Sequence, residues 1–286
     1  MGKIAIVTDS TADIPQDLIK KFNIVVVPLT VSFGEEFFKV DGIELTNEEF
    51  CKKLETSKEL PKTIQPSPGD FVETYKKLFQ NYDQIISIHI SKKMSGTLDS
   101  AQIAKKEFPD KVIEVIDSEL VHMPLGFIVL EAADMAIKDF DLDKILARIQ
   151  FLKQNMHSLF IPRTLEYLQK GGRIGRAKSL VASLLEIKPI LTLNLGEVSP
   201  YKNTRRWNQA KEEIINSMKN ILPNPKNLTV SVGDLNLRQD GEEMFERIKK
   251  ELNPKKILRV DFGPIVGAHL GPAIGITFYD RSPIEG

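Results

Sequence analysis

A short hydroxyl-rich stretch, Ser95-Gly96-Thr97, is the part of this sequence best suited to meet an anion. It follows residues 85–90, whose alternation predicts a strand, and it precedes apolar positions at helical spacing over 97–104. Free backbone N–H groups and the positive end of the helix dipole point outward at such a junction. Ser95 therefore either binds an anionic ligand or caps its own helix, and both interpretations stay open.

Two further residues have the chemistry to hold an anion. His269 stands in Gly267-Ala268-His269-Leu270-Gly271, where small neighbours leave the ring sterically open and able to donate a hydrogen bond. A structural histidine bonded to local backbone is the more frequent use of this residue type. Arg173 follows a glycine pair and could grip a phosphate through its guanidinium group, although a solvated surface arginine is the more frequent case.

Motifs of the common enzyme and metal classes are missing from the sequence. There is no GxxxxGK[ST], GxGxxG, HExxH or GxSxG, and Cys51 is the only cysteine. The other three histidines share no metal-ligand spacing, and the acidic loop 9–13 is better suited to capping than to binding a metal. We therefore expect no metal, no cofactor and no catalytic residue.

Composition limits the classes of partner. The 286 residues are 42% hydrophobic and 27% charged, with 39 basic and 39 acidic side chains, so no net field attracts nucleic acid. The N-terminal residues run directly into a strand and lack the apolar core of a signal peptide. The most apolar run, residues 124–130, is too short to span a membrane. We expect a cytoplasmic protein with no stable membrane insertion.

Strands and helices alternate through the first half of the chain, which predicts a mainly parallel α/β sheet with ligands at the carboxyl ends of its strands. Strands are expected at 3–8, 24–27, 85–90 and 112–116, a hairpin at 29–33 and 36–40, helices at 15–22, 46–54, 70–79, 97–104 and 124–137, and a rigid loop at 62–69.

A helix over 142–154 could link two halves, which places a domain boundary near residue 155 and predicts domains 1–155 and 156–286. The second half is expected to contain strands at 158–161, 190–193, 198–202, 229–233 and 257–261, helices at 180–185, 205–221 and 239–252, and a glycine-rich loop at 263–275 before a last strand to 279.

Taken together, several stretches resemble the DegV family of bacterial fatty-acid-binding proteins. They occur in the family's order and cover nearly the whole chain: residues 8–15 (TDSTADIP), 63–69 (TIQPSPG), 94–97 (MSGT), 117–118 (DS), 168–174 (LQKGGRI), 188–191 (KPIL) and 263–275. No single piece is specific, but the ordered set is.

The resemblance implies two α/β domains, the first a mainly parallel Rossmann-like sheet and the second a smaller mixed-sheet domain, with one long-chain fatty acid between them. It implies that Thr63, Ser95 with Gly96, and His269 hold the fatty-acid carboxylate. It also implies a carrier that is not itself an enzyme and that presents the acid to a fatty acid kinase for acyl-phosphate formation. Arg173 would then lie near the phosphorylated end.

Two other functions compete with carriage. One is a phosphotransferase or acyl hydrolase that uses His269 with Ser95, and the other is a ligand-sensing module that regulates a partner protein. Departures from the family pattern at Ile64, Lys92 and Ala268 leave the three head-group positions intact. The segment around Trp207 is less basic than is usual in the family.

Overall fold

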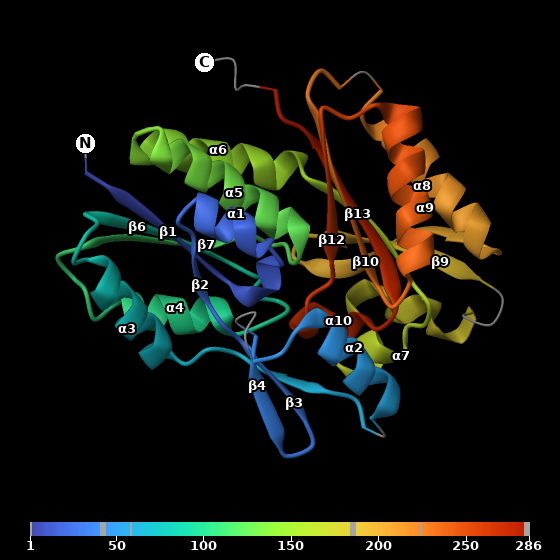
Figure 1. Cartoon of the computed structure of the whole chain (residues 1–286), viewed down its shortest axis with the longest axis horizontal. Helices are drawn as coiled ribbons and strands as arrows, with labels where there is room; N and C mark the ends of the chain where they lie inside the picture. The colour runs from blue at the N-terminus through green and yellow to red at the C-terminus, as the bar shows by residue number, and fades with distance from the viewer. Residues whose placement is uncertain (1, 41–43, 58, 184–186, 224, 283–286) are drawn as a thin grey trace. The chain divides into compact units, whose positions relative to one another are not determined.

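The chain divides into two compact units in the computed structural model, which describes residues 2–40, 44–57, 59–183, 187–223 and 225–282 (Figure 1). The first unit comprises Met1–Gln154 and Gly263–Val266, and the second comprises Asn155–Phe262 and Gly267–Gly286. The domain limits 1–155 and 156–286 stay a prediction.

The first unit is built on a four-stranded sheet in which every neighbouring pair is parallel, so the parallel α/β prediction is confirmed. The strands lie in the order β2 (Val25–Val27), β1 (Ile4–Asp9), β6 (Gln84–His89) and β7 (Val112–Asp117). Because they are parallel, their carboxyl ends line one edge. Asp9, His89 and Asp117 end three adjacent strands at that edge.

Helices cover both faces of this sheet (Figure 1). One face receives Phe71 and Tyr75 from α3 and Ala101 from α4, packed against Ala5 and Val7 of β1. On the other, α5 packs along β1 and β6 and is buried from Met123 to Ala133. The helices of this unit are α1 (Gln16–Lys21), α2 (Asn47–Thr56), α3 (Pro68–Leu78), α4 (Thr97–Lys105), α5 (Met123–Ile137) and α6 (Leu142–Asn155).

A small antiparallel sheet, β4-β3-β5, completes the first unit. The predicted hairpin is confirmed as β3 (Thr30–Phe33) and β4 (Glu36–Lys39), and α2 begins with the capping box of Thr46 and Glu49. The prediction of a loop over 62–69 was wrong at both ends. Its first residues form β5 (Lys62–Ile64) on the free edge of β3, and Ser67 caps α3, which starts at Pro68.

The second unit is built on a six-stranded mixed sheet, as predicted for the second domain. Only β11 and β12 are parallel, while the other neighbouring pairs are antiparallel. The order is β10 (Glu197–Thr204), β9 (Lys188–Asn194), β8 (His157–Pro162), β13 (Ala273–Asp280), β11 (Leu228–Leu235) and β12 (Lys256–Asp261). Helices α8 (Trp207–Ile221) and α9 (Arg238–Leu252) pack on one face through residues such as Ile214, Met218 and Met244.

The glycine-rich segment 263–275 is not the loop that we predicted. Residues Pro264–Leu270 form a short helix, α10, with proline as its first residue, where the missing N–H is harmless. Gly271 ends it at φ 65, a left-handed conformation that favours glycine, and its N–H donates to the Gly267 carbonyl at 2.9 Å. His269 therefore lies in the last turn of a helix.

The remaining helical segments are short: the 3₁₀ turn η1 (Ser10–Ala12), α7 (Glu166–Lys170) and the 3₁₀ segment η2 (Gly175–Ser183). The helix predicted over 180–185 falls in η2 up to Ser183, and η2 begins five residues before it. Residues 184 and 185 lie outside the described residues.

A polar cluster joins α8 to α9 in the second unit. The Asp240 carboxylate accepts hydrogen bonds from the Trp207 indole and the Lys211 ammonium, both at 3.0 Å, and Lys211 also pairs with Glu243. The Arg163 guanidinium lies 4.0 Å from the centre of the Trp207 ring. Because only 3% of the Lys211 side chain is exposed, its charge depends on these two carboxylates.

Asp240→Ala should lower the free energy of unfolding by about 1–3 kcal/mol, since Lys211 stays buried with one carboxylate instead of two. Urea denaturation followed by circular dichroism measures the change. Glu48→Ala, which removes an exposed ion pair with Lys52, is the matched control and should leave stability nearly unchanged, because solvent screens the pair. Equal effects of the two substitutions would contradict the assignment.

Candidate functional site

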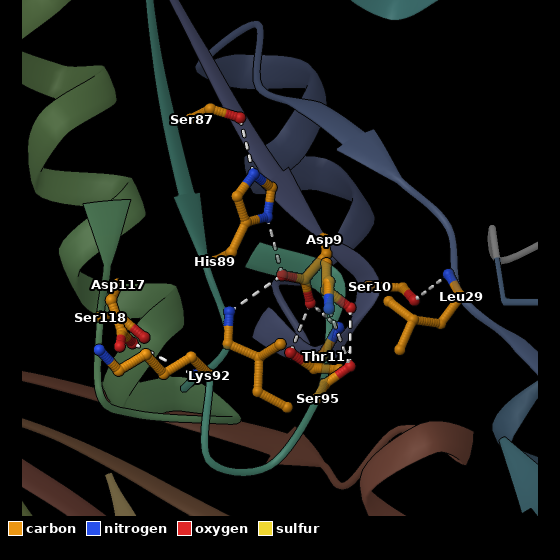
Figure 2. Close-up of polar contacts among 12 residues, drawn as sticks. Asp9, Ser10, Thr11, Leu29, Ser87, His89, Lys92, Ser95, Asp117 and Ser118 are labelled. Carbon is orange, nitrogen blue, oxygen red and sulfur yellow. Dashed lines mark hydrogen bonds and ion pairs between the residues drawn. The ribbon is translucent and has the colours of Figure 1, made fainter. Parts of the chain in front are cut away.

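The buried carboxylate of Asp9 organises the edge of the parallel sheet (Figure 2). One oxygen accepts the Thr11 N–H at 3.0 Å and the Thr11 hydroxyl at 2.5 Å. The other accepts the Ile90 N–H and the His89 Nδ1–H, both at 3.0 Å. A carboxylate has room for about four donors, so these bonds satisfy it without exposure to water. Asp9 thereby joins the end of β1 to the end of β6.

A chain of buried hydrogen bonds extends behind Asp9 through His89 and Ser87 to Tyr75. The Tyr75 hydroxyl donates to Ser87 Oγ at 2.8 Å, and Ser87 Oγ is hydrogen-bonded to His89 Nε2, 2.6 Å away. His89 Nδ1, on the opposite side of the ring, lies 3.0 Å from Asp9 Oδ2, so the imidazole links Ser87 to Asp9. Burial raises the pKa of Tyr75, which keeps the phenol protonated and donating.

Ser95 lies half-buried in the turn between β6 and α4. Its N–H donates to the Ser91 carbonyl at 3.1 Å. Its hydroxyl oxygen accepts the Thr97 N–H at 3.3 Å and lies 2.8 Å from Thr97 Oγ1. The local, helix-starting role of this hydroxyl is therefore present, although Gly96 rather than Ser95 occupies the N-cap position. A ligand role for Ser95 stays a prediction.

The segment that carries Thr63 packs against the turn that carries Ser95. A Cβ atom on Gly96 would overlap the side-chain amide of Gln65, and that amide donates to the Ser100 hydroxyl at 3.3 Å. Gly96 leaves room for the Gln65 amide in its present position, and its φ of −76 does not itself call for glycine. Gln65 was not among the predicted site residues, although it lies inside the TIQP stretch that carries the family resemblance.

Three of the residues that matter for the predicted site meet in the second unit, where α7 ends and α10 ends. Arg173 Nη1 donates to the Gly171 carbonyl at 2.6 Å, and Gly172 turns the chain at φ 72. A Cβ atom on Gly171 would overlap Nδ1 of His269. Gly171, Arg173 and His269 are thus in one cluster, and the glycine is needed to let the imidazole ring lie against the backbone.

The His269 ring is half-buried, whereas we expected its small neighbours to leave it sterically open. Burial, and then the positive charge of Arg173, lower the pKa of His269 to about 4. The ring is therefore neutral near pH 7 and can donate one hydrogen bond to an anion without carrying a charge. With so low a pKa it is a weak base.

The predicted site residues are divided between the two units: Thr63, Ser95 and Gly96 belong to the first, and His269 and the predicted phosphate contact Arg173 belong to the second. Their joint action on one ligand stays a prediction. The expectation that the loop 9–13 caps a helix is confirmed, because Asp9 accepts the Thr11 N–H at the start of η1. Among the described residues no group of three or more histidine, cysteine or acidic side chains could hold a metal.

The family of the chain follows from sequence comparison. A family model described as "Uncharacterised protein, DegV family" matches residues 3–281. This chain belongs to the DegV family. A DegV domain-containing protein of Caldanaerobacter subterraneus subsp. tengcongensis is 36% identical over 282 residues, which are 98% of this chain and 100% of the relative.

Solved structures of DegV proteins share the fold. One, described as fatty acid binding of a DegV family protein from Thermus thermophilus, matches with a TM-score of 0.92 and 32% identity over 97% of this chain and 99% of its own. DegV from Bacillus subtilis, described as a fatty acid binding protein, matches with a TM-score of 0.91 and 30% identity over 98% of this chain and 100% of its own. A protein from Eubacterium ventriosum, described as stearic acid-binding, matches with a TM-score of 0.88 and 27% identity over 98% of this chain and 99% of its own. These relatives are described by a ligand and not by a reaction.

A membrane-spanning helix is not found in the part of the DegV chain that the structure describes, because its helices are too short or too polar.

Ser87→Ala should lower the free energy of unfolding by about 2–3 kcal/mol, because it leaves the Tyr75 hydroxyl and His89 Nε2 buried without this partner. Tyr75→Phe removes only the outer donor and should cost about 1 kcal/mol. Chemical denaturation of both variants tests the order. If Tyr75→Phe proved the more damaging substitution, Ser87 would not be the central member of this hydrogen-bonded chain.

Gly171→Ala should displace the His269 ring and move its pKa from about 4 toward the ordinary 6.5, because the added Cβ would overlap the imidazole. NMR titration of the ring measures this. Gly172→Asn is the control, since a Cβ there meets nothing within 4 Å and asparagine tolerates positive φ. A His269 titration unchanged in Gly171→Ala would refute the packing argument.

Proposed function

We propose that this DegV protein is a carrier that binds one long-chain fatty acid. The observation that supports this most directly is the full-length match, at 30% identity or more, to two solved structures described as fatty acid binding. The chain also keeps threonine, serine and histidine at 63, 95 and 269, where the family resemblance assigns the carboxylate-binding groups. These three residues are our proposed head-group site.

The energetics favour a tail-dominated mode of binding. Burying a chain of about sixteen carbons yields roughly 11 kcal/mol before the costs of association, at about 0.8 kcal/mol per methylene. Each charge-assisted hydrogen bond to the carboxylate adds about 1.5–3 kcal/mol. The tail therefore supplies most of the affinity, and the head group sets the orientation of the acid.

The proposed head-group residues suit an anion that must later leave. Thr63 and Ser95 offer hydroxyl groups, and His269 offers a neutral imidazole because its pKa is lowered to about 4. Arg173, the cation whose charge acts on this histidine, has an exposed side chain. A buried arginine fork would hold a carboxylate much more firmly.

The alternative, a phosphotransferase or acyl hydrolase using His269 and Ser95, has less support. A histidine with a pKa near 4 is a poor general base at pH 7, and the charge acting on it comes from a cation, Arg173. In a serine hydrolase the charge beside the catalytic histidine is a carboxylate, which favours the imidazolium.

We further propose that the carrier presents its ligand to a fatty acid kinase, with Arg173 near the carboxyl end that becomes phosphorylated. Native mass spectrometry of the purified protein tests the first step and should detect one intact fatty acid per chain. Incubation with a fatty acid kinase and ATP tests the second and should give acyl phosphate. Turnover of an ester or acyl phosphate by the protein alone would favour the enzyme instead.

Ser95→Ala should weaken fatty-acid affinity roughly tenfold while leaving the fold intact, because it removes one hydrogen bond to the carboxylate. The dissociation constant for a defined fatty acid, measured on delipidated protein, reports the effect. Ser179→Ala, at an exposed serine of the second unit, is the control and should bind as the wild type does. Equal affinity in both variants would remove Ser95 from the proposed site.

A further inference from the structure

Asp13, which the proposed function does not use, lies in an unusual backbone environment. It adopts φ 48, in the left-handed region, at the end of the 3₁₀ turn η1. Its carboxylate is buried, and Oδ2 accepts a hydrogen bond from Nδ1 of His122 at 2.6 Å. Burial raises the pKa of Asp13 in spite of its hydrogen bonds. A buried carboxylate of this kind opposes folding unless its contacts compensate.

His122, the partner of Asp13, is strained as well. It adopts φ 61 and ψ −152, a region that is used almost only by glycine. Its N–H donates to the Thr11 carbonyl at 2.8 Å, and a Cβ on Gly126, one turn further along α5, would overlap the Ala12 carbonyl. The turn η1 is therefore pressed onto the start of α5, which holds His122 in this conformation. Strain that is maintained in this way often marks a functional constraint.

The second oxygen of Asp13 reaches a distant part of the chain. The Gly263 N–H donates to the Asp13 carboxylate, and a Cβ on Gly263 would overlap Asp13 Oδ1. Gly263 immediately precedes α10. The four residues Gly263–Val266 belong to the first unit, although the segments on both sides of them belong to the second. The hydrogen bond from the Gly263 N–H to Asp13 is therefore one of the contacts that hold the start of α10 in the first unit.

We propose that Asp13 is a positioning residue for His269. By fixing Gly263 it sets where α10 begins, and α10 carries His269 in its last turn. The strained pair with His122 orients the carboxylate toward Gly263. The inference rests on the proposed function in so far as His269 serves a fatty-acid carboxylate.

The test follows the His269 ring in ligand-free, full-length protein. NMR titration should place the wild-type pKa near 4, and loss of the signal in His269→Gln assigns it among the four histidines. Asp13→Ala should raise that pKa by roughly one unit or more, because a displaced α10 lets water reach the ring. Asp13→Asn is the matched control, since its amide oxygen can still accept the Gly263 N–H and asparagine tolerates positive φ.

Gly263→Ala alters the contact between Asp13 and Gly263 at the glycine instead of at the aspartate. It leaves Asp13 and His122 in place, but the new Cβ would overlap Asp13, so it should shift the His269 titration in the same direction as Asp13→Ala. If Asp13→Ala fails to fold by circular dichroism, Gly263→Ala decides alone. A structural role confined to stability would leave the His269 pKa unchanged in every folded variant, and that result would overturn the inference.

Fatty-acid binding by the same proteins separates this inference from the proposed function. Affinity should fall roughly tenfold in the variants that shift His269 and should stay near wild type in Asp13→Asn. If the wild type bound no fatty acid while Asp13→Ala still shifted His269, the positioning would stand and the carrier function would fail. If the wild type bound fatty acid while His269 kept its wild-type pKa in Asp13→Ala and in Gly263→Ala, the carrier function would stand and Asp13 would lose its role.

Discussion

The first unit depends on burying one carboxylate, that of Asp9. A buried carboxylate is tolerable only when its hydrogen-bond capacity is filled, and in this unit the donors come from the turn η1 and from the end of β6. Filling that capacity fixes both segments at once, because each donor has a preferred distance and direction. The turn that follows β6 and contains Ser95 therefore starts from a backbone position that Asp9 sets.

Two acidic residues of one loop act in different ways because their surroundings differ. Asp9 meets four donors at the sheet edge, whereas Asp13, four residues later, is bonded to His122 and Gly263 and has a raised pKa. Asp9 thus secures the start of the turn before Ser95, and Asp13 secures the start of the helix that carries His269. The loop 9–13 is in this way attached to both elements that bear these two proposed head-group residues.

Local patterns in the sequence were sufficient for most of the fold but not for these contacts. The capping box at Thr46 and the alternating strands of the parallel sheet were predicted because their signals lie within a few residues. The strand β5 was missed because prolines follow it and its partner strand β3 lies far back in the sequence, with Val31 opposite Thr63. Helix α10 was missed because glycine and proline suggest a loop, and its end at Gly271 depends on a positive φ. The bond between Asp9 and His89 spans 80 residues, so no local spacing announces it.

The two histidines that matter most show why residue type alone does not decide function. Ser87, His89 and Asp9 form the hydrogen-bonded order of a serine hydrolase, yet all three are fully buried, so no substrate can reach the serine. His269 differs in the opposite way. A serine, Ser95, is among the proposed site residues, but the charged neighbour of His269 is a cation and its pKa is near 4. The buried set has the hydrogen-bonded order of a catalyst but no access for a substrate, and His269 lacks the basicity of a catalytic histidine. Neither supports nucleophilic catalysis, whereas a neutral imidazole remains suited to donating a hydrogen bond to a carboxylate.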